Sequence, residues 1–323
     1  MAVEGKLIEE NVRIRRFEVD HNFDGWRLDK FLANRISGMS RSLAGRVARD
    51  GSVEVEPPRK VKAGTRLRLG DRVEIREELE PEVVQDAEVD ILYQDDTLLI
   101  LNKPAGMLVH ETATVRLNTV THYLNRRGME EAEPAHRLDR ETSGALVCAR
   151  THESAPELCG LFADGDPSKI YRALVVDEQR RWEVGAEESI DIPLGKDDSS
   201  ELGLRMGRGD LEALTHVEVL GRRDHPMGEL ADLKIRIVTG RQHQIRVHLA
   251  LMGTPIAGDK LYGKSDEFFM AICDRPEDES LLDQLHFSRH ALHAWQISLT
   301  HPADGRRLEV RAPVPQIFLA GDE

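Results

Sequence analysis

Five charged side chains crowd one short stretch, and their types could do chemistry. In AHRLDRETSGALVCAR, residues 135–150, six positions before an apolar run hold His136, Arg137, Asp139, Arg140 and Glu141. A carboxylate beside a buried strand is desolvated, which raises its pKa, whereas a neighbouring guanidinium keeps it ionised and aimed. Asp139 is therefore a candidate nucleophile or base. The alternative is a solvated surface turn with weak ion pairs.

A second cationic stretch could supply the partner of Asp139. The segment GRQHQIRVH holds Arg241 and Arg246, together with two histidines, at the start of an expected helix. The orienting cation could therefore be one of these two, or Arg137 or Arg140 from the loop itself.

The histidines and cysteines do not indicate a metal site. His243 and His248 are five positions apart, which is not the spacing of an HExxH helix, and no Glu stands between them. The three cysteines show no CxxC spacing, so we expect neither a disulfide framework nor a zinc ribbon. No Gly-rich phosphate cradle occurs either, and we expect no metal and no cofactor.

Composition limits the class of protein. The chain has 323 residues, 40% of them hydrophobic, which is enough for one large domain or two ordinary ones. No apolar run reaches the length of a membrane helix, and the charged N-terminus lacks the apolar core of a secretory signal. We therefore expect a cytoplasmic protein without a membrane partner, acting as a monomer.

The charge is unevenly distributed. The net charge of −14 argues against a nucleic-acid partner, yet residues 13–76 hold sixteen Lys or Arg against nine Asp or Glu. A basic module on an acidic body keeps RNA open as a partner.

Residues 25–76 form a coherent unit that follows an N-terminal extension, residues 1–24. Its first segment spaces apolar residues at helical intervals. A second helix is expected to begin at Ser40, to bury Leu43 and Val47, and to end at Gly51. The unit resembles the S4-type RNA-binding domain, and its exposed arginines are candidate phosphate contacts: Arg41, Arg46 and Arg49. The alternative is a generic helix-and-sheet module with solvated arginines.

An acidic linker, residues 77–89, separates this unit from a strand-rich domain, residues 90–323. Many short alternating strands with scattered helices predict an α+β fold with a mainly antiparallel mixed sheet.

Four motifs in order resemble the RluA-type pseudouridine synthase family. In chain order they are LYQDDTLLILNKPAGMLVH, HRLDRETSGALVCAR, KIYRALV and GRQHQIRVHLALMGTPIAGDKLYG, followed by C-terminal strands that also match. The resemblance covers about residues 25–318. It implies isomerisation of uridine to pseudouridine in RNA, with the target nucleotide extruded from its helix or loop.

The resemblance also implies roles for individual residues. Asp139 matches the catalytic aspartate, Arg246 the arginine that pairs with it, and Tyr171 the tyrosine that lies against the uracil. Whether the aspartate attacks C1′ or removes a ribose proton stays open. Further residues are expected to bind substrate or shape the site: Arg137, His136, Arg241, His243 and Gln244.

The chain departs from the family pattern at three places. Gln242 stands where Thr or Ser is usual, and EVEPPRK replaces an Asn-Gly turn in the N-terminal unit. Residues 264–289 form a longer acidic segment that could be a lid, a specificity loop or a neutral insertion.

Ribosomal RNA, by analogy with members that carry the N-terminal domain, is the expected substrate. Transfer RNA is the alternative within the same chemistry. A catalytically silent RNA-binding or ribosome-assembly factor is the alternative from another class.

Overall fold

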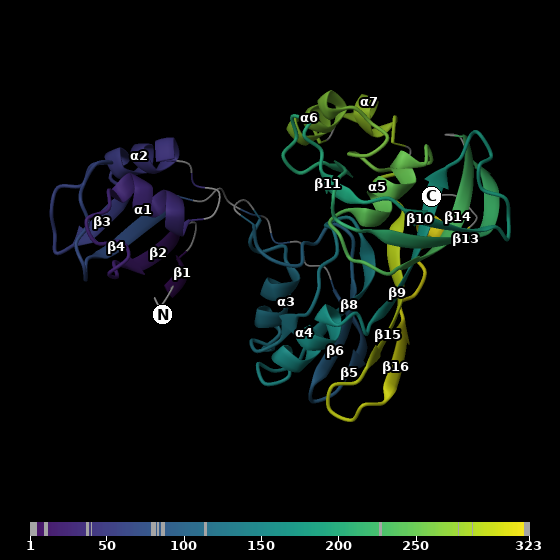
Figure 1. The fold of residues 1–323 in the computed structure, drawn as a ribbon, viewed down its shortest axis with the longest axis horizontal. Coiled ribbons are helices and arrows are strands. Elements are labelled where there is room, and N and C mark those ends of the chain that lie inside the picture. Colours follow the sequence, from purple (N-terminus) through teal and green to yellow (C-terminus); the bar gives the residue numbers. More distant parts are fainter. Residues whose placement is uncertain are drawn as a thin grey trace. The chain divides into compact units, whose positions relative to one another are not determined.

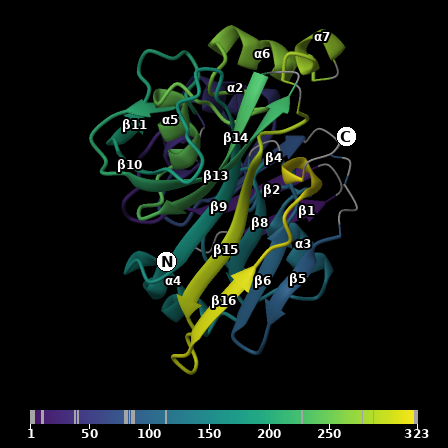
Figure 2. The same cartoon turned by 90° about the vertical axis from the view of Figure 1, so that its right-hand side faces the viewer.

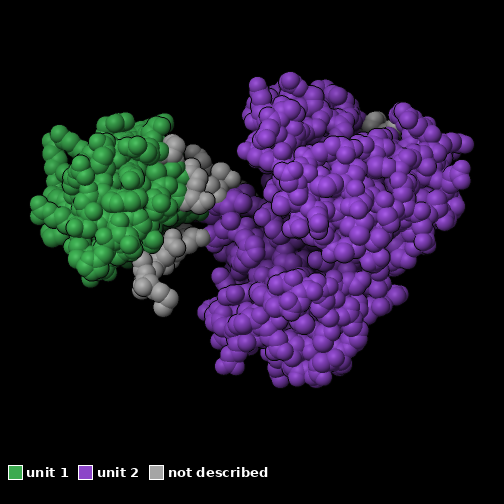
Figure 3. Space-filling model, in the orientation of Figure 1, with its two compact units in different colours: residues 1–83 green, residues 84–323 purple. Residues whose placement is uncertain are grey.

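The chain divides into two compact units, residues 1–83 and 84–323 (Figure 3). The computed structural model describes residues 5–9, 12–36, 39, 41–78, 82, 84, 88–112, 115–225, 228–276, 278–285 and 287–319.

The N-terminal unit pairs two helices with a small antiparallel sheet. Its elements are β1 (Gly5–Glu9), β2 (Val12–Glu18), α1 (Leu28–Arg35), α2 (Arg41–Asp50), β3 (Val53–Glu56) and β4 (Arg72–Glu78). The strand order is β1-β2-β4-β3. One buried apolar cluster joins helices and sheet, and its members include Phe17, Leu28, Phe31, Leu32 and Val73.

The limits of this unit differ from those expected. Strand β2 lies within the predicted extension, and β4 continues past residue 76. Strand β2 is hard to recognise in the sequence because its buried and exposed residues do not alternate strictly. Arg13 and its neighbour Ile14 are both buried. Of the predicted linker 77–89, only residues 77, 78, 82, 84, 88 and 89 are described.

Helix α2 buries mainly small residues, and of the two apolar residues predicted to be buried only Val47 packs, partly buried, against the apolar cluster. Ala44, Gly45 and Ala48 are buried, whereas Leu43 is 37% exposed, so its expected burial is wrong. A Cβ on Gly45 would lie 3.5 Å from Cβ of Ala63, so the adjoining loop comes close to this helix face and favours small residues there. Gly51 follows the helix with φ of +92°, as expected, and the predicted cap Ser40 lies outside the described residues.

The second unit contains most of the chain's strands (Figure 1). Its strands are β5 (Asp90–Gln94), β6 (Leu98–Lys103), β7 (Glu133–Pro134), β8 (Ser143–Ala149), β9 (Ser168–Val176), β10 (Glu187–Asp191), β11 (Leu194–Lys196), β12 (Met206–Arg208), β13 (Leu214–His225), β14 (Gly228–Ile237), β15 (Leu292–Thr300) and β16 (Arg307–Arg311). Its helices are α3 (Val120–Arg126), α4 (Ala155–Ala163), α5 (Gln244–Leu251), α6 (Asp266–Asp274), α7 (Glu279–Leu282) and the 3-10 turn η1 (Gln316–Phe318).

The predicted α+β fold with a mainly antiparallel mixed sheet is confirmed. Strands follow the order β10-β13-β14-β9-β15-β8-β6-β5, with β16 beside β15 and β7 beside β8 (Figures 1 and 2). The pair β15–β8 is parallel, and the other strand pairs in the described part of this sheet are antiparallel. Strand β8 is buried along its whole length, which explains its continuous apolar sequence.

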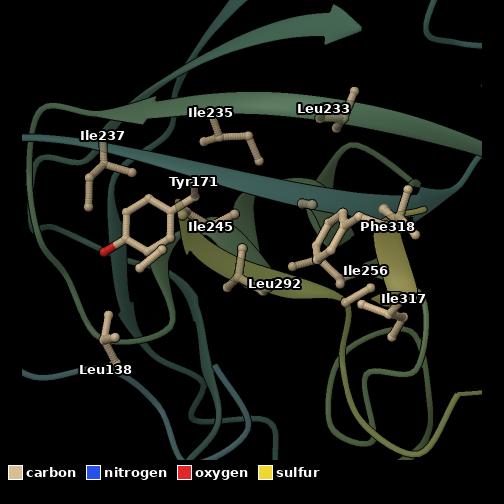
Figure 4. Close-up of a cluster of buried hydrophobic side chains, with 14 of the residues drawn as sticks. Leu138, Tyr171, Leu233, Ile235, Ile237, Ile245, Ile256, Leu292, Ile317 and Phe318 are labelled. Atoms are coloured by element: carbon tan, nitrogen blue, oxygen red, sulfur yellow. The ribbon is translucent and has the colours of Figure 1, made fainter. Parts of the chain in front are cut away.

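The core of this unit extends to the ring of Tyr171 on β9. Figure 4 shows this ring beside Ile237, with Leu138 at the same end of the cluster and Phe318 at the other end. The apolar core therefore forms one wall of the region that holds the predicted site residues.

Candidate active site

The loop that bears Asp139 is fixed at several points. It connects β7 to β8, and the amide of Thr142 donates to the carbonyl of Asp139 at 3.1 Å. The fully buried ammonium of Lys103 donates to the carbonyls of Met107 and Arg140, at 2.7 and 3.2 Å. Burial lowers the pKa of Lys103 to about 7, against the opposing charge of Asp139.

A glycine lets the strand after this loop approach its neighbour. Gly144 has φ of +111°, and a Cβ on it would lie 2.2 Å from the carbonyl oxygen of Ala294 on β15. The parallel contact between β8 and β15 therefore requires glycine at this position, directly after the loop that bears Asp139.

Arg246 is the cation that contacts Asp139. Its Nη1 donates to Oδ2 of Asp139 at 3.0 Å from the first turns of α5. Burial alone would raise the pKa of Asp139, but the neighbouring cationic groups, Arg246 first among them, and the hydrogen bond from Arg246 together lower it. The side chain of Asp139 is 21% exposed, so a carboxylate held ionised still faces the exterior.

The same guanidinium also binds a second carboxylate. Nε and Nη2 of Arg246 donate to the two oxygens of Asp259, at 2.7 and 2.9 Å, and the side chain of Asp259 is fully buried. Burial alone would lower the pKa of Arg246, yet the two carboxylates raise it overall. Arg246 therefore stays charged.

Tyr171 is a buried aromatic partner. Its pKa is raised, first by burial and then by the charge of Asp139. The ring is 7% exposed, so it presents a small aromatic surface and a neutral hydroxyl.

His243 has a strained backbone and a fixed ring. It is one of two non-glycine residues with positive φ (+55°) among those described, and such strain clusters at functional sites. The hydroxyl of Tyr262 accepts from the amide of Met206 at 3.0 Å and lies 2.9 Å from Nδ1 of His243. This contact fixes the ring so that Nε2 lies 3.8 Å from Oδ1 of Asp139. Burial lowers the pKa of His243, so the ring is neutral near pH 7.

All eight predicted catalytic and substrate residues line one cavity of about 300 Å³. These residues are His136, Arg137, Asp139, Tyr171, Arg241, His243, Gln244 and Arg246. Segments more than a hundred residues apart in sequence thus meet at one site.

Three of the lining residues are also held by protein groups. Nε2 of His136 accepts from the amide of Val147 at 3.0 Å, and Nε of Arg241 donates to the carbonyl of Glu212 at 2.9 Å. Gln244 is buried and bonds through both ends of its amide, with Nε2 donating to the carbonyl of Leu214 at 3.0 Å. Arg137 is exposed at the edge of the cavity.

Sequence reasoning assigned no role to four further residues near Asp139: Lys103, Lys169, Asp259 and Tyr262. Lys169 lines the cavity. All four residues belong to segments that resemble the family, and this could have marked them as candidate site residues. Their contacts could not be predicted from the sequence.

The predicted RNA-binding arginines lie in the other unit. Arg41, Arg46 and Arg49 are exposed on α2, off its buried face. Arg41 also lies 3.6 Å from Oδ2 of Asp29. The three side chains are therefore accessible to a partner.

Asp139, its partner Arg246 and the buried Tyr171 line one cavity, as the active site of an enzyme would require. Residues 97–251 match the family described as RNA pseudouridylate synthase. The chain is 31% identical over 309 residues to "Ribosomal large subunit pseudouridine synthase D" of Vibrio parahaemolyticus, covering 93% of this chain and 90% of that protein. It is 32% identical over 321 residues to "Ribosomal large subunit pseudouridine synthase C" of Vibrio cholerae, covering 95% of each. The chain therefore belongs to the RNA pseudouridylate synthase family, and the predicted RluA-type resemblance is confirmed.

A solved structure supports the same assignment. "Human RNA Pseudouridylate Synthase Domain Containing 1" is 25% identical with a TM-score of 0.55, covering 73% of this chain and 86% of that chain. The protein is thus an RNA pseudouridine synthase, an isomerase whose substrate class is RNA.

The described residues contain neither a candidate metal site nor a candidate membrane helix. No group of three or more His, Cys, Asp or Glu among them could hold a metal ion. No helix in the described part of the chain is both long and apolar enough to cross a membrane.

Proposed function

We propose that this enzyme isomerises specific uridines of large-subunit ribosomal RNA, with Asp139 acting at the ribose. The observation that carries the proposal is the Asp139–Arg246 pair at the cavity that Tyr171 also lines. The ribosomal target is supported by two relatives named as ribosomal large subunit pseudouridine synthases, which this chain matches over most of its length. A monomer in the cytoplasm is part of the same proposal.

The reaction breaks the bond between C1′ and N1 and forms one between C1′ and C5; C5 then loses its proton, and N1 takes one up. Asp139 acts at the sugar as a nucleophile or as a base, and both chemistries need the ionised carboxylate that Arg246 maintains. Tyr171 supplies an aromatic face for the extruded uracil, worth about 1–3 kcal/mol of stacking. Its hydroxyl, neutral near pH 7, can take part in moving the proton at C5.

The edge of the cavity is cationic. We propose that Arg137 and Arg241 contact the RNA around the extruded nucleotide, since Arg binds phosphate well. His243, whose Nε2 lies 3.8 Å from Oδ1 of Asp139, is proposed to contact the ribose of the bound nucleotide. Gln244 and His136 position the cavity wall and the loop, because their polar atoms bond to protein groups.

The N-terminal unit is proposed to be an S4-like module that grips RNA through Arg41, Arg46 and Arg49. Its two helices on a small sheet and its basic composition support this role. The exposure of the three arginines supports it further.

The test is to map pseudouridines across all cellular RNA with and without the gene, and after complementation. Wild type should restore sites in large-subunit ribosomal RNA, and Asp139→Asn should restore none, because the amide keeps the size but cannot act as nucleophile or base. Asp166→Asn is the matched control: its carboxylate is 23% exposed and bonds Arg307 at 2.9 Å, away from the cavity. Sites that depend on the gene only in transfer RNA would refute the ribosomal target. Restoration by Asp139→Asn would refute the catalytic role.

A further inference from the structure

Arg246 is shared unequally between two carboxylates. Asp259 takes two of its N–H groups, at 2.7 and 2.9 Å, and Asp139 takes one at 3.0 Å. A bidentate pairing fixes the plane of a guanidinium, whereas a single bond does not. The orientation of Arg246 toward Asp139 is therefore set mainly from the side of Asp259.

Asp259 is itself held rigidly. Its Oδ1 accepts from the backbone amides of Leu261 and Tyr262, at 2.9 and 3.0 Å. The preceding Gly258 has φ of +77°, and a Cβ on it would lie 2.2 Å from the carbonyl oxygen of Arg289. The loop is thus packed too closely for the carboxylate to move freely.

The charges of this group favour reactivity at Asp139. One guanidinium and two carboxylates sum to −1. Because Asp259 is fully buried and bidentate, it compensates Arg246, and the excess negative charge rests on the partly exposed Asp139. Burial would raise the pKa of Asp259, but Arg246 lowers it to about 2, so it stays ionised.

Other titratable groups face the two carboxylates from neighbouring elements. They are Lys103 on β6, Glu141 on the catalytic loop, Tyr171 on β9, His243 before α5, Tyr262 after it, and His290 before β15. Burial lowers the pKa of His290 to about 4, so it adds no charge near pH 7. Burial raises the pKa of Tyr262 to about 12, so it also stays neutral.

We propose that Asp259 is a positioning residue for uridine isomerisation, which fixes the plane of Arg246 and offsets its charge so that Asp139 is aimed but not overstabilised. The inference rests on the proposed role of Asp139. Asp259 acts only through Arg246 and does not touch the substrate. Without it, the full charge of Arg246 would act on Asp139, and the guanidinium would lose its fixed plane.

Asp259→Asn tests the inference in the full-length enzyme with an RNA fragment that contains a mapped site. We expect kcat to fall about 10- to 100-fold, as a displacement near 1 Å at reacting groups does. KM should stay within about threefold, because Asp259 is buried away from RNA. The acid limb of kcat/KM should move to lower pH, because the variant removes a negative charge near Asp139 and so lowers its pKa further.

Asp177→Asn is the matched control. Asp177 is also buried, bonds an arginine (Arg222, 2.6 Å), and accepts from two backbone amides, of Arg181 and Trp182. It lies outside the cavity, so any loss of stability there should leave the acid limb unmoved. If Asp259→Asn lowers activity equally at every pH, or moves the limb to higher pH, the inference is wrong.

Asp259→Glu covers the case in which the Asn variant does not fold. It keeps the buried pair charge-balanced but moves the carboxylate by about one bond length, so kcat should fall about tenfold or more with little change in KM. Wild-type kcat in this folded variant would overturn the inference. Asp139→Asn separates the two claims: if it stays active, the proposed function fails, whereas an inactive Asp139→Asn beside a fully active Asp259→Asn refutes only the positioning role.

Discussion

Replacing Arg41, Arg46 and Arg49 together by Gln should flatten the salt dependence of RNA binding. Gln favours helix about as well as Arg, and all three side chains are exposed on α2, so the fold should be kept. Each phosphate contact contributes about 0.9 to the slope of log affinity against log salt on duplex RNA. Because Arg41 lies 3.6 Å from Asp29, we count two to three contacts, or about 1.8–2.7 in slope.

The expected size can be converted into affinities. Between about 50 and 200 mM salt, wild type should lose about 12- to 40-fold more affinity than the triple variant. Turnover on a long natural RNA should show a raised KM with a nearly unchanged kcat.

Titration of labelled RNA at several salt concentrations measures both slopes. The matched control replaces the same three residues by Lys, which keeps the charges and should keep the slope. Parallel slopes for wild type and the Gln variant would show that these arginines are merely solvated, and would refute the RNA-gripping role of α2.

Three further predictions concern the second unit. Gly144→Ala should lower both Tm and turnover, because its Cβ would clash with the backbone of Ala294; thermal unfolding at wild-type Tm would contradict the close approach. Arg246→Met should abolish turnover. It should also lower the free energy of unfolding by about 3–5 kcal/mol, because Asp259 would keep a buried unpaired charge. Urea unfolding measures this loss, and an inactive but fully stable variant would contradict it. The free energy of unfolding should fall as pH is lowered from about 6.5 toward 4. Over this range histidines of the unfolded chain bind protons, whereas the buried imidazoles of the folded protein stay neutral. The histidines concerned have pKa values lowered by burial to about 3 or 4: His136, His290 and His293. Urea titrations across this pH range test this, and replacing His293 by Gln should weaken the dependence.

Periodicity predicted the main elements of the fold, and the family resemblance predicted both the residues of the cavity and the contact between Arg246 and Asp139. The apolar period of α5 and its terminal Gly253 are confirmed, and the helix places Arg246 against Asp139. Residue type and spacing alone left four arginines available as partners of Asp139, and only the family resemblance selected Arg246 among them: Arg137, Arg140, Arg241 and Arg246. Which one meets the carboxylate depends on the approach of two segments more than a hundred residues apart.

The failures have a common cause in close packing. Leu43 was expected to be buried because of its helical spacing. This spacing predicts which way a side chain points, but not how much space it meets there. Ala63 lies close to this helix face and limits the space for larger side chains. It belongs to a loop whose distance from α2 cannot be predicted from a local sequence pattern. Asp259 was passed over for the same reason, since the feature that matters is its bidentate contact with a residue of the preceding helix.

The acidic segment 264–289 illustrates how far contacts can narrow an open question. Residues on both sides of its two helices contact Glu141 of the catalytic loop: Lys260 bonds its carboxylate, and Arg289 donates to its carbonyl at 3.3 Å. Asp266, at the start of α6, bonds Arg205 at 2.7 Å. The helices also share an apolar cluster of their own, formed by Ile272, Leu281 and Leu285. A lid needs few attachments to open, so this anchoring favours a support for the catalytic loop over a lid.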